Sequence, residues 1–368
     1  MRSPLAVLAL LSFALGSDPV EAQATNPDSA RLITGDISNF WRAIDHAAGK
    51  GGDTAALIVA LRDDYLKNPS PGLFDWVVNR LISQDAVGKT LEAKGWSRER
   101  AMSAMAAAPG TPDRAGFDTI VMPAVLENAA RNLATSYLAR RRYYDAIRPN
   151  TLAVDTARAI KDSIHAAFRR MSSLYPDAKY ADAYFLIGRM TSGGTTGRNT
   201  LLIGTEMFSR DPTTPIDELP AWHRAVTGQI SNLPQIVAHE MIHTLQGKRE
   251  GKATLLSAAL GEGSADFLAE LISGKHIINP AYAYGDAREA ELWVKFKTEM
   301  DSSNTSNWLY QGDRAPPGVP ADLGYWMGYK ISKAYYDKAA DKKAAVREIL
   351  LYKDARAFLL ASGYRPSN

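Results

Sequence analysis

The sequence predicts an α+β protein that is mostly helical. Apolar residues recur at helical spacing over most of the chain, and two short apolar runs separated by a glycine-rich loop lie near its middle. An H-E-x-x-H motif at residues 239–243 lies in the helical part that follows. The 368 residues carry a net charge of +3, which over this length does not favour binding to nucleic acid or to an anionic membrane surface.

The first 24 residues have the features of a secretory signal peptide. Arg2 precedes the apolar run Leu5–Leu15, and Ala22-Gln23-Ala24 supplies the small residues that signal peptidase requires. A buried N-terminal helix is the alternative interpretation. The apolar run is too short to span a bilayer, and no later run reaches the roughly 18 apolar residues that a span needs. We therefore expect an exported protein, periplasmic or secreted, with no membrane span.

The chain contains no cysteine. Disulfides and thiolate metal ligands are therefore not expected. A lipid anchor attached through a cysteine is not expected either.

Residues 25–175 are expected to form a helical N-terminal region. Phe40, Trp41 and Ile44 recur at helical spacing, and Pro69–Gly72 interrupts the pattern before it resumes. The composition changes after Pro176. We therefore expect a boundary near this point, with residues 176–368 forming the second region.

The second region begins with two predicted strands. Ala183–Met190 and Thr200–Phe208 are rich in apolar, aromatic and β-branched residues. The turn-rich loop Thr191–Gly197 joins them. We expect a small antiparallel sheet here, followed from Ala221 onward by further helices.

The strongest chemical signal is the segment His239-Glu240-Met241-Ile242-His243. Histidines four residues apart lie on one face of a helix, so their imidazoles can bind one zinc ion together. Glu240 lies where it can take a proton from a metal-bound water. The alternative is a helix that carries two surface histidines.

A second segment supplies further candidate residues. Glu262 is the predicted third zinc ligand, because open zinc sites keep three protein ligands. Asp266 follows one helical turn later, where it can accept a hydrogen bond from the free ring nitrogen of a ligand histidine, with His239 as the expected partner. The other histidines have no partner at ligand spacing and are expected to be structural or exposed: His46, His165, His223 and His276.

These two segments together resemble the gluzincin metallopeptidases. The 18 residues between His243 and Glu262 are similar to the spacing in the aminopeptidase branch, and Glu262 with Asp266 is similar to the thermolysin branch. The mature chain also resembles a largely unassigned group of bacterial predicted zinc-dependent proteases, in which helices precede a glycine-rich strand pair and the zinc helix. The resemblance implies a zincin-like catalytic region over residues 176–368, with the H-E-x-x-H helix in its active site.

The resemblance also implies a tyrosine beside the metal that stabilises an oxyanion. Tyr325 lies about sixty residues past Glu262, at the distance found in the aminopeptidase branch. Tyr329 is an alternative, and both tyrosines could instead belong to an apolar helical stripe. The chain departs from that branch at Gly204–Phe208, which replaces the G-x-M-E-N strand that binds a substrate amine. This departure argues against aminopeptidase action.

Together these observations predict a zinc metallopeptidase that acts on a peptide or protein substrate. Zinc held by His239, His243 and Glu262 activates a water, Glu240 acts as the general base, and Tyr325 assists. Two alternatives remain open. One is a zinc hydrolase of a non-peptide amide or ester, and the other is a non-enzymatic helical binding module with a residual zinc site.

Overall fold

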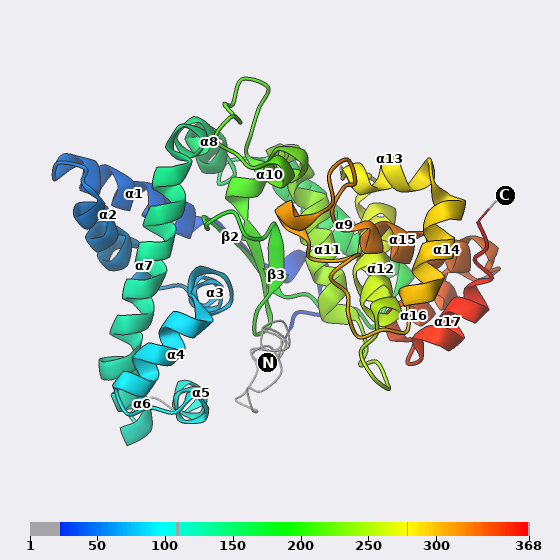
Figure 1. Ribbon diagram of the computed structural model, residues 1–368, viewed down its shortest axis with the longest axis horizontal. Coiled ribbons are helices and arrows are strands. Elements are labelled where there is room, and N and C mark those ends of the chain that lie inside the picture. The colour runs from blue at the N-terminus through cyan, green and yellow to red at the C-terminus, as the bar shows by residue number, and fades with distance from the viewer. Residues whose placement is uncertain (1–22, 108–109, 278, 367–368) are drawn as a thin grey trace. The chain divides into compact units, whose positions relative to one another are not determined.

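The computed structural model describes residues 23–107, 110–277 and 279–366 (Figure 1). The predicted signal peptide, residues 1–24, lies outside the described residues except for its last two positions. The chain forms two units that are each assembled from separate segments. The described residues of the first unit fall in Met1–Gln23, Leu32–Asp155 and Asp182–Glu206, and those of the second in Ala24–Arg31, Thr156–Ala181 and Met207–Asn368.

The first unit is mainly helical. Several of its helices begin at a polar residue: the side chains of Asp53, Ser70 and Ser83 each accept a hydrogen bond from the backbone N–H three residues later. The predicted apolar positions Phe40 and Trp41 are buried in its core. Its helices are α1 Gly35–Gly49, α2 Thr54–Ala60, α3 Pro71–Trp76, α4 Gln84–Ala93, α5 Arg98–Ala106, α6 Pro112–Gly116, α7 Met122–Ala139 and α8 Arg141–Ala153, with π-helical turns η3 Leu61–Leu66, η4 Val77–Leu81 and η5 Phe117–Val121.

A four-stranded sheet completes the first unit. Its strands lie in the order β1-β2-β4-β3, with bounds β1 Leu32–Ile33, β2 Asp182–Leu186, β3 Gly194–Thr196 and β4 Thr200–Gly204. β1 pairs parallel to β2, and β2 pairs parallel to β4, whereas β3 pairs antiparallel to β4. Every residue of β4 is buried, as expected for a central strand with a parallel neighbour.

The sheet is therefore mixed, and the predicted antiparallel sheet is wrong. Two apolar runs joined by a glycine loop suggest a hairpin, but the loop contains a strand of its own. This strand, β3, takes the antiparallel place beside β4, so that β2 pairs with the other edge of β4 in the parallel sense. The second predicted strand also ends early, because Thr205–Phe208 forms a 3-10 turn.

The second unit consists of helices. α12 lies at its centre and packs against α9, α11 and α15. A capping box between Thr254 and Ser257 begins α12, and Gly274 ends it with a left-handed φ of +72°. The helices are α9 Arg158–Leu174, α10 Ala221–Val226, α11 Leu233–Leu245, α12 Leu255–Ser273, α13 Pro280–Asp286, α14 Glu289–Glu299, α15 Leu323–Lys338, α16 Lys342–Leu351 and α17 Ala355–Ser362.

Two glycines allow α12 and α15 to approach closely. A Cβ atom on Gly263 would lie 2.1 Å from the backbone nitrogen of Tyr329, and a Cβ atom on Gly328 would lie 1.8 Å from the carbonyl oxygen of Ala259. These neighbours are backbone atoms, so no side-chain rotation can relieve the contact. The crossing of α12 and α15 therefore requires glycine at both positions.

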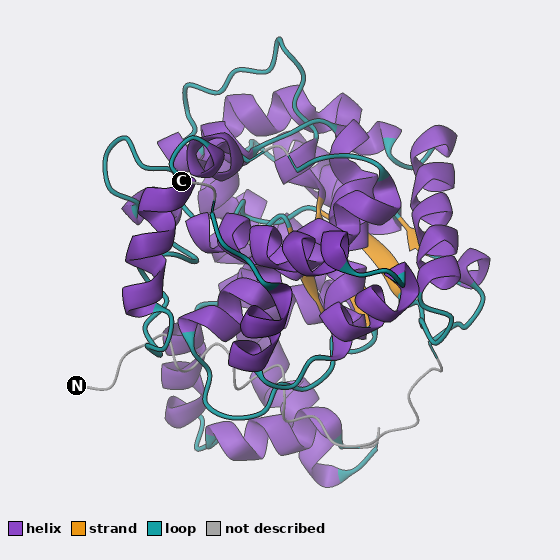
Figure 2. Ribbon diagram, turned by 90° about the vertical axis from the view of Figure 1, so that its right-hand side faces the viewer, coloured by secondary structure: helices purple, strands orange, loops and turns teal. Residues whose placement is uncertain are grey.

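Helices dominate the fold and strands form a small part of it (Figure 2). The prediction of a mostly helical α+β protein is confirmed at this level. Among the described residues, no helix combines the length and apolar composition that a bilayer span requires.

Candidate metal centre

Helix α11 presents two histidines on one side. Pro234 lies in its first turn, and Val237 and Met241 anchor the opposite, apolar side in the core. The side chains of His239 and His243 therefore project together, and their Nε2 atoms lie 3.0 Å apart.

Helix α12 brings the third predicted ligand to these histidines. The Oε2 atom of Glu262 lies 3.3 Å from Nε2 of His243 and 3.6 Å from Nε2 of His239. Ligands of a tetrahedral zinc ion, bound at 2.0–2.1 Å, lie about 3.4 Å from one another. The triangle formed by these three atoms therefore has the size that a zinc ion requires.

Asp266 lies beside His239. Its Oδ1 atom is 2.7 Å from Nδ1 of His239. A carboxylate at this distance accepts a hydrogen bond from the Nδ1–H group, which leaves the Nε2 lone pair directed at the cluster. Its other oxygen, Oδ2, accepts a hydrogen bond of 2.5 Å from the hydroxyl of Tyr282 on α13.

Gln246 has the corresponding role for His243, a role that the sequence pattern did not predict. Its Oε1 atom lies 3.0 Å from Nδ1 of His243, while its Nε2 donates to the carbonyl of Gly261 and to Oγ of Ser264. These two bonds orient the amide so that its oxygen faces the imidazole. Its position three residues after His243, at the end of the helix, was the signal that could have identified it.

The cluster requires positive charge at its centre. Two imidazole lone pairs and a carboxylate oxygen face one another, an arrangement that is repulsive unless a cation lies between them. Although burial lowers it, the pKa of His239 is raised well above its usual value by Asp266. Burial raises the pKa of Glu262, but the histidines beside it, His243 first, hold it well below its usual value. The site thus stabilises a cation, whether a proton or a metal ion.

The remaining predicted site residues lie at different distances from the cluster. Glu240 is buried on α11, and the ring of Tyr325 stacks on His239 with 6.3 Å between the ring centroids. Tyr329 lies elsewhere, because its hydroxyl donates to Oε2 of Glu270. The structure therefore brings Tyr325, and not Tyr329, beside the cluster.

The histidines outside the motif have other partners. Nδ1 of His46 lies 2.5 Å from Oδ2 of Asp64, and Nδ1 of His276 lies 2.6 Å from Oε2 of Glu270. His165 contacts the carbonyl of Ala30, and His223 is buried. None of these side chains belongs to the metal-ligating group found among the described residues.

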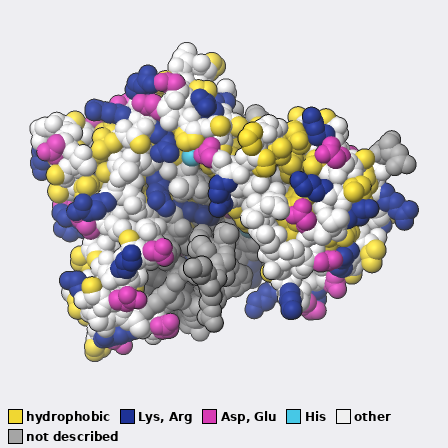
Figure 3. Space-filling model, viewed as in Figure 1, with side chains coloured by type: hydrophobic (Ala, Val, Ile, Leu, Met, Phe, Trp, Pro, Cys, Tyr) yellow, Lys and Arg dark blue, Asp and Glu magenta, His cyan; other side chains and the backbone are white. Residues whose placement is uncertain are grey.

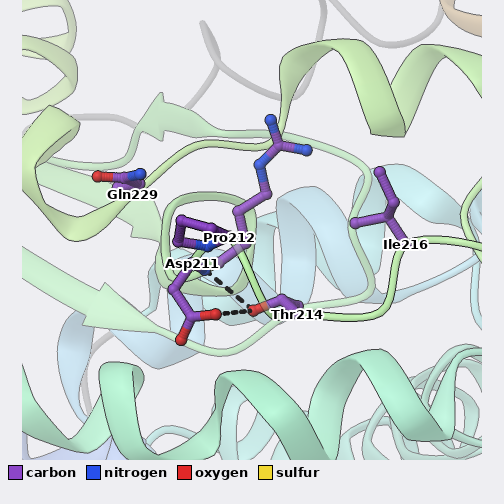
Figure 4. A pocket seen from close by; sticks show the side chains of 6 residues that line it. Asp211, Pro212, Thr214, Ile216 and Gln229 are labelled. Atoms are coloured by element: carbon purple, nitrogen blue, oxygen red, sulfur yellow. Dashed lines mark hydrogen bonds between the residues drawn. The ribbon is translucent and has the colours of Figure 1, made fainter.

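A separate cavity of about 330 Å³ lies in the second unit (Figure 4). At its wall, the backbone N–H of Asp211 donates a hydrogen bond to Oγ1 of Thr214, and this hydroxyl donates to Oδ1 of Asp211. These polar groups therefore stabilise the local turn. None of the cluster residues lines this cavity. Its lining consists of Arg210, Asp211, Pro212, Thr214, Ile216 and Gln229.

The fold and the site together define a mostly helical α+β protein with a partly buried His–His–Glu cluster suited to a metal ion. Residues 128–366 match the model of the family described as Gliding motility protein GldB. This match covers more than half of the chain, and the protein belongs to that family. Neither the curated proteins nor the solved structures contain a significant match.

The family assignment corrects the predicted activity. The match is to a gliding motility family of lipoproteins and not to a peptidase family, so the assignment to gluzincin metallopeptidases is wrong. The predictions of an enzyme and of a hydrolase or protease are overturned with it, and the predicted peptide substrate is left without support. The catalytic roles of Glu240 and Tyr325 depended on that activity. Family membership does support the predicted export.

Proposed function

We propose that this protein is a non-enzymatic component of its gliding motility family that binds protein partners in the periplasm or after secretion. We further propose that one zinc ion, held by His239, His243 and Glu262, joins α11 to α12 in the second unit. The observation that carries the metal proposal is the convergence of two imidazole lone pairs and one carboxylate oxygen within 3.6 Å of one another.

The chemistry of the ligands favours zinc over other divalent ions. Calcium and magnesium prefer oxygen ligands, whereas a site with two imidazoles and one carboxylate suits zinc. Asp266 and Gln246 support this choice, because each accepts a hydrogen bond from the Nδ1–H of one histidine, and such partners orient the ring and increase its basicity. Because its ligands come from both α11 and α12, a bound zinc ion contributes directly to the stability of the fold.

The surface of the second unit supports a role in protein binding. Hydrophobic side chains gather over α13 and its surroundings on the face shown in Figure 3. Val294 and Tyr310 are large apolar side chains of this unit that are at least half exposed. Apolar groups gathered on a surface favour contact with another protein. The family's description as gliding motility proteins agrees with such a role.

The zinc content of the purified protein tests the metal proposal. Residues 25–368, produced without a histidine tag, should contain about one zinc ion per chain. His243→Ala should lose it, because two remaining ligands do not retain the ion through dialysis. Chelation of the metal should lower the melting temperature of the wild-type protein, and added zinc should restore it.

The matched control is His276→Ala, which removes an exposed histidine of the same unit. It should keep the zinc ion and the melting temperature of the wild type. Wild-type protein that contains no zinc, and takes up none when it is added, would contradict the proposal.

A comparison of two variants in cells tests the non-enzymatic role. In a host strain that lacks the protein and shows a resulting defect, Glu240→Gln should restore the wild-type phenotype. His243→Ala should not, because it removes the metal that stabilises the second unit. A failure of Glu240→Gln, in a variant that folds and keeps its zinc, would show that the carboxylate of Glu240 does more than occupy its buried position.

A further inference from the structure

A tyrosine in the loop between α14 and α15 reaches the metal cluster. The hydroxyl of Tyr310 donates a hydrogen bond of 2.7 Å to Oε1 of Glu262. The other oxygen of this carboxylate, Oε2, is the one that faces both histidines. The two oxygens of Glu262 are therefore assigned to different partners.

The backbone around Tyr310 is strained and is held in place by paired contacts. Tyr310 has a φ of +58°, and Asp322 has a φ of +67°. Left-handed conformations of this kind are unfavourable for residues other than glycine and persist where their surroundings impose them. Here the backbone N–H of Gln311 donates to Oδ1 of Asp322, and the backbone N–H of Asp322 donates to Oε1 of Gln311.

A third contact holds the backbone of Tyr310. The guanidinium of Arg314 donates to the carbonyl of Tyr310 at 2.7 Å. The preceding residues, Trp308 and Leu309, are buried and anchor the loop in the core of the unit. The Tyr310 side chain itself is 50% exposed, so burial of its ring does not account for its position.

We infer that Tyr310 is a positioning residue that keeps Glu262 a one-oxygen ligand of the metal. A carboxylate whose Oε1 accepts a hydrogen bond from a phenol presents Oε2 alone to the ion. The protein then supplies three donor atoms to the ion, one each from His239, His243 and Glu262. The loop that carries Tyr310 thereby sets the geometry of a metal ion bound between α11 and α12. This inference rests on the proposed zinc site.

Tyr310→Phe removes the hydroxyl and leaves the exposed ring. The variant should bind zinc about 10- to 100-fold more weakly than the wild type in competition with a chelator, as is usual when the partner of a ligand is lost. With cobalt(II) in place of zinc, its visible absorption should weaken, because Glu262 can then bind through both oxygens and raise the coordination number.

The matched control is Tyr284→Phe, a tyrosine of the same unit whose ring contacts Arg288 and not the cluster. It should keep the zinc affinity and the cobalt spectrum of the wild type. A second variant, Gln311→Ala, breaks the pair with Asp322 and should shift both measurements in the direction of Tyr310→Phe.

The outcomes separate the two proposals. If the wild type binds neither zinc nor cobalt, the zinc site is refuted and this inference with it. If the wild type binds both metals, and Tyr310→Phe binds them with unchanged affinity and spectrum, the zinc site stands and the role of Tyr310 is refuted.

Discussion

Gly263→Ala is expected to destabilise the second unit by about 3 kcal/mol or more, at the upper end of the range for overpacked sites. The new methyl group would lie 2.1 Å from the backbone nitrogen of Tyr329 and 2.3 Å from the backbone carbon of Gly328. Because these are backbone atoms, α12 and α15 must move apart, and the packing around the crossing is lost. Thermal unfolding should show a fall in melting temperature of about 10 °C.

The chain offers a matched control two residues earlier on the same helix. A Cβ atom at Gly261 meets nothing within 4 Å. Gly261→Ala should therefore stabilise the protein by about 0.5–1 kcal/mol, through the lower backbone entropy of alanine in the unfolded chain. Equal melting temperatures for the two variants would contradict the packing explanation of Gly263.

This result bears on how the motif around Glu262 is interpreted. The resemblance that included Glu262, the residue before Gly263, implied a peptidase. The structure supplies a packing reason for glycine at this position, which is independent of any reaction.

Glu206→Gln is expected to stabilise the first unit at alkaline pH by up to about 3 kcal/mol. The Glu206 side chain is fully buried; its Oε1 accepts the backbone N–H of Met190, and its Oε2 has no hydrogen-bond partner among the described residues. Burial raises the pKa of Glu206 to about 7, against a usual value of 4.5. The folded protein therefore binds a proton more tightly than the unfolded chain does.

The sign of the pH dependence follows from this difference. Between about pH 4.5 and pH 7 the folded state holds more protons than the unfolded state, so the free energy of unfolding falls as the pH rises through this range. Above pH 7 the loss is complete. Glu206→Gln removes the titrating group and should exceed the wild type only slightly at pH 5 but by most of the full difference at pH 8, in denaturant unfolding measured at both values.

The exposed residue Glu92 on α4 provides the control. Glu92→Gln should leave the difference in stability between pH 5 and pH 8 as it is in the wild type. If the stability of Glu206→Gln changes between pH 5 and pH 8 as much as that of the wild type does, the titration of Glu206 is not the cause of the pH dependence.

The sequence predicted those parts of the molecule that depend on local geometry. Helical periodicity predicted that most of the chain is helical, and the four-residue spacing of His239 and His243 predicted that they share one face. Glu262 and Asp266, one turn apart on a single helix, followed from the same spacing. The structure brings these four side chains together. Each pair lies within one helix, where sequence spacing fixes the direction of the side chains.

The same local pattern did not predict the function of the protein. The local motif resembles a peptidase, yet the match over residues 128–366 places the chain in a gliding motility family. A short motif reports the ligands available to a metal ion and does not by itself define the use of the site.

Tertiary structure alone decided the contacts between segments that are distant in sequence. Tyr282 and Tyr310 reach Asp266 and Glu262 from α13 and from the loop before α15, and no periodic pattern connects these positions. The parallel pairing of β2 with β4 was equally hidden, because the direction of a strand depends on the path of the chain between strands and not on the composition of either. Spacing within one helix is a property of the sequence, whereas the meeting of two segments depends on how the whole core packs.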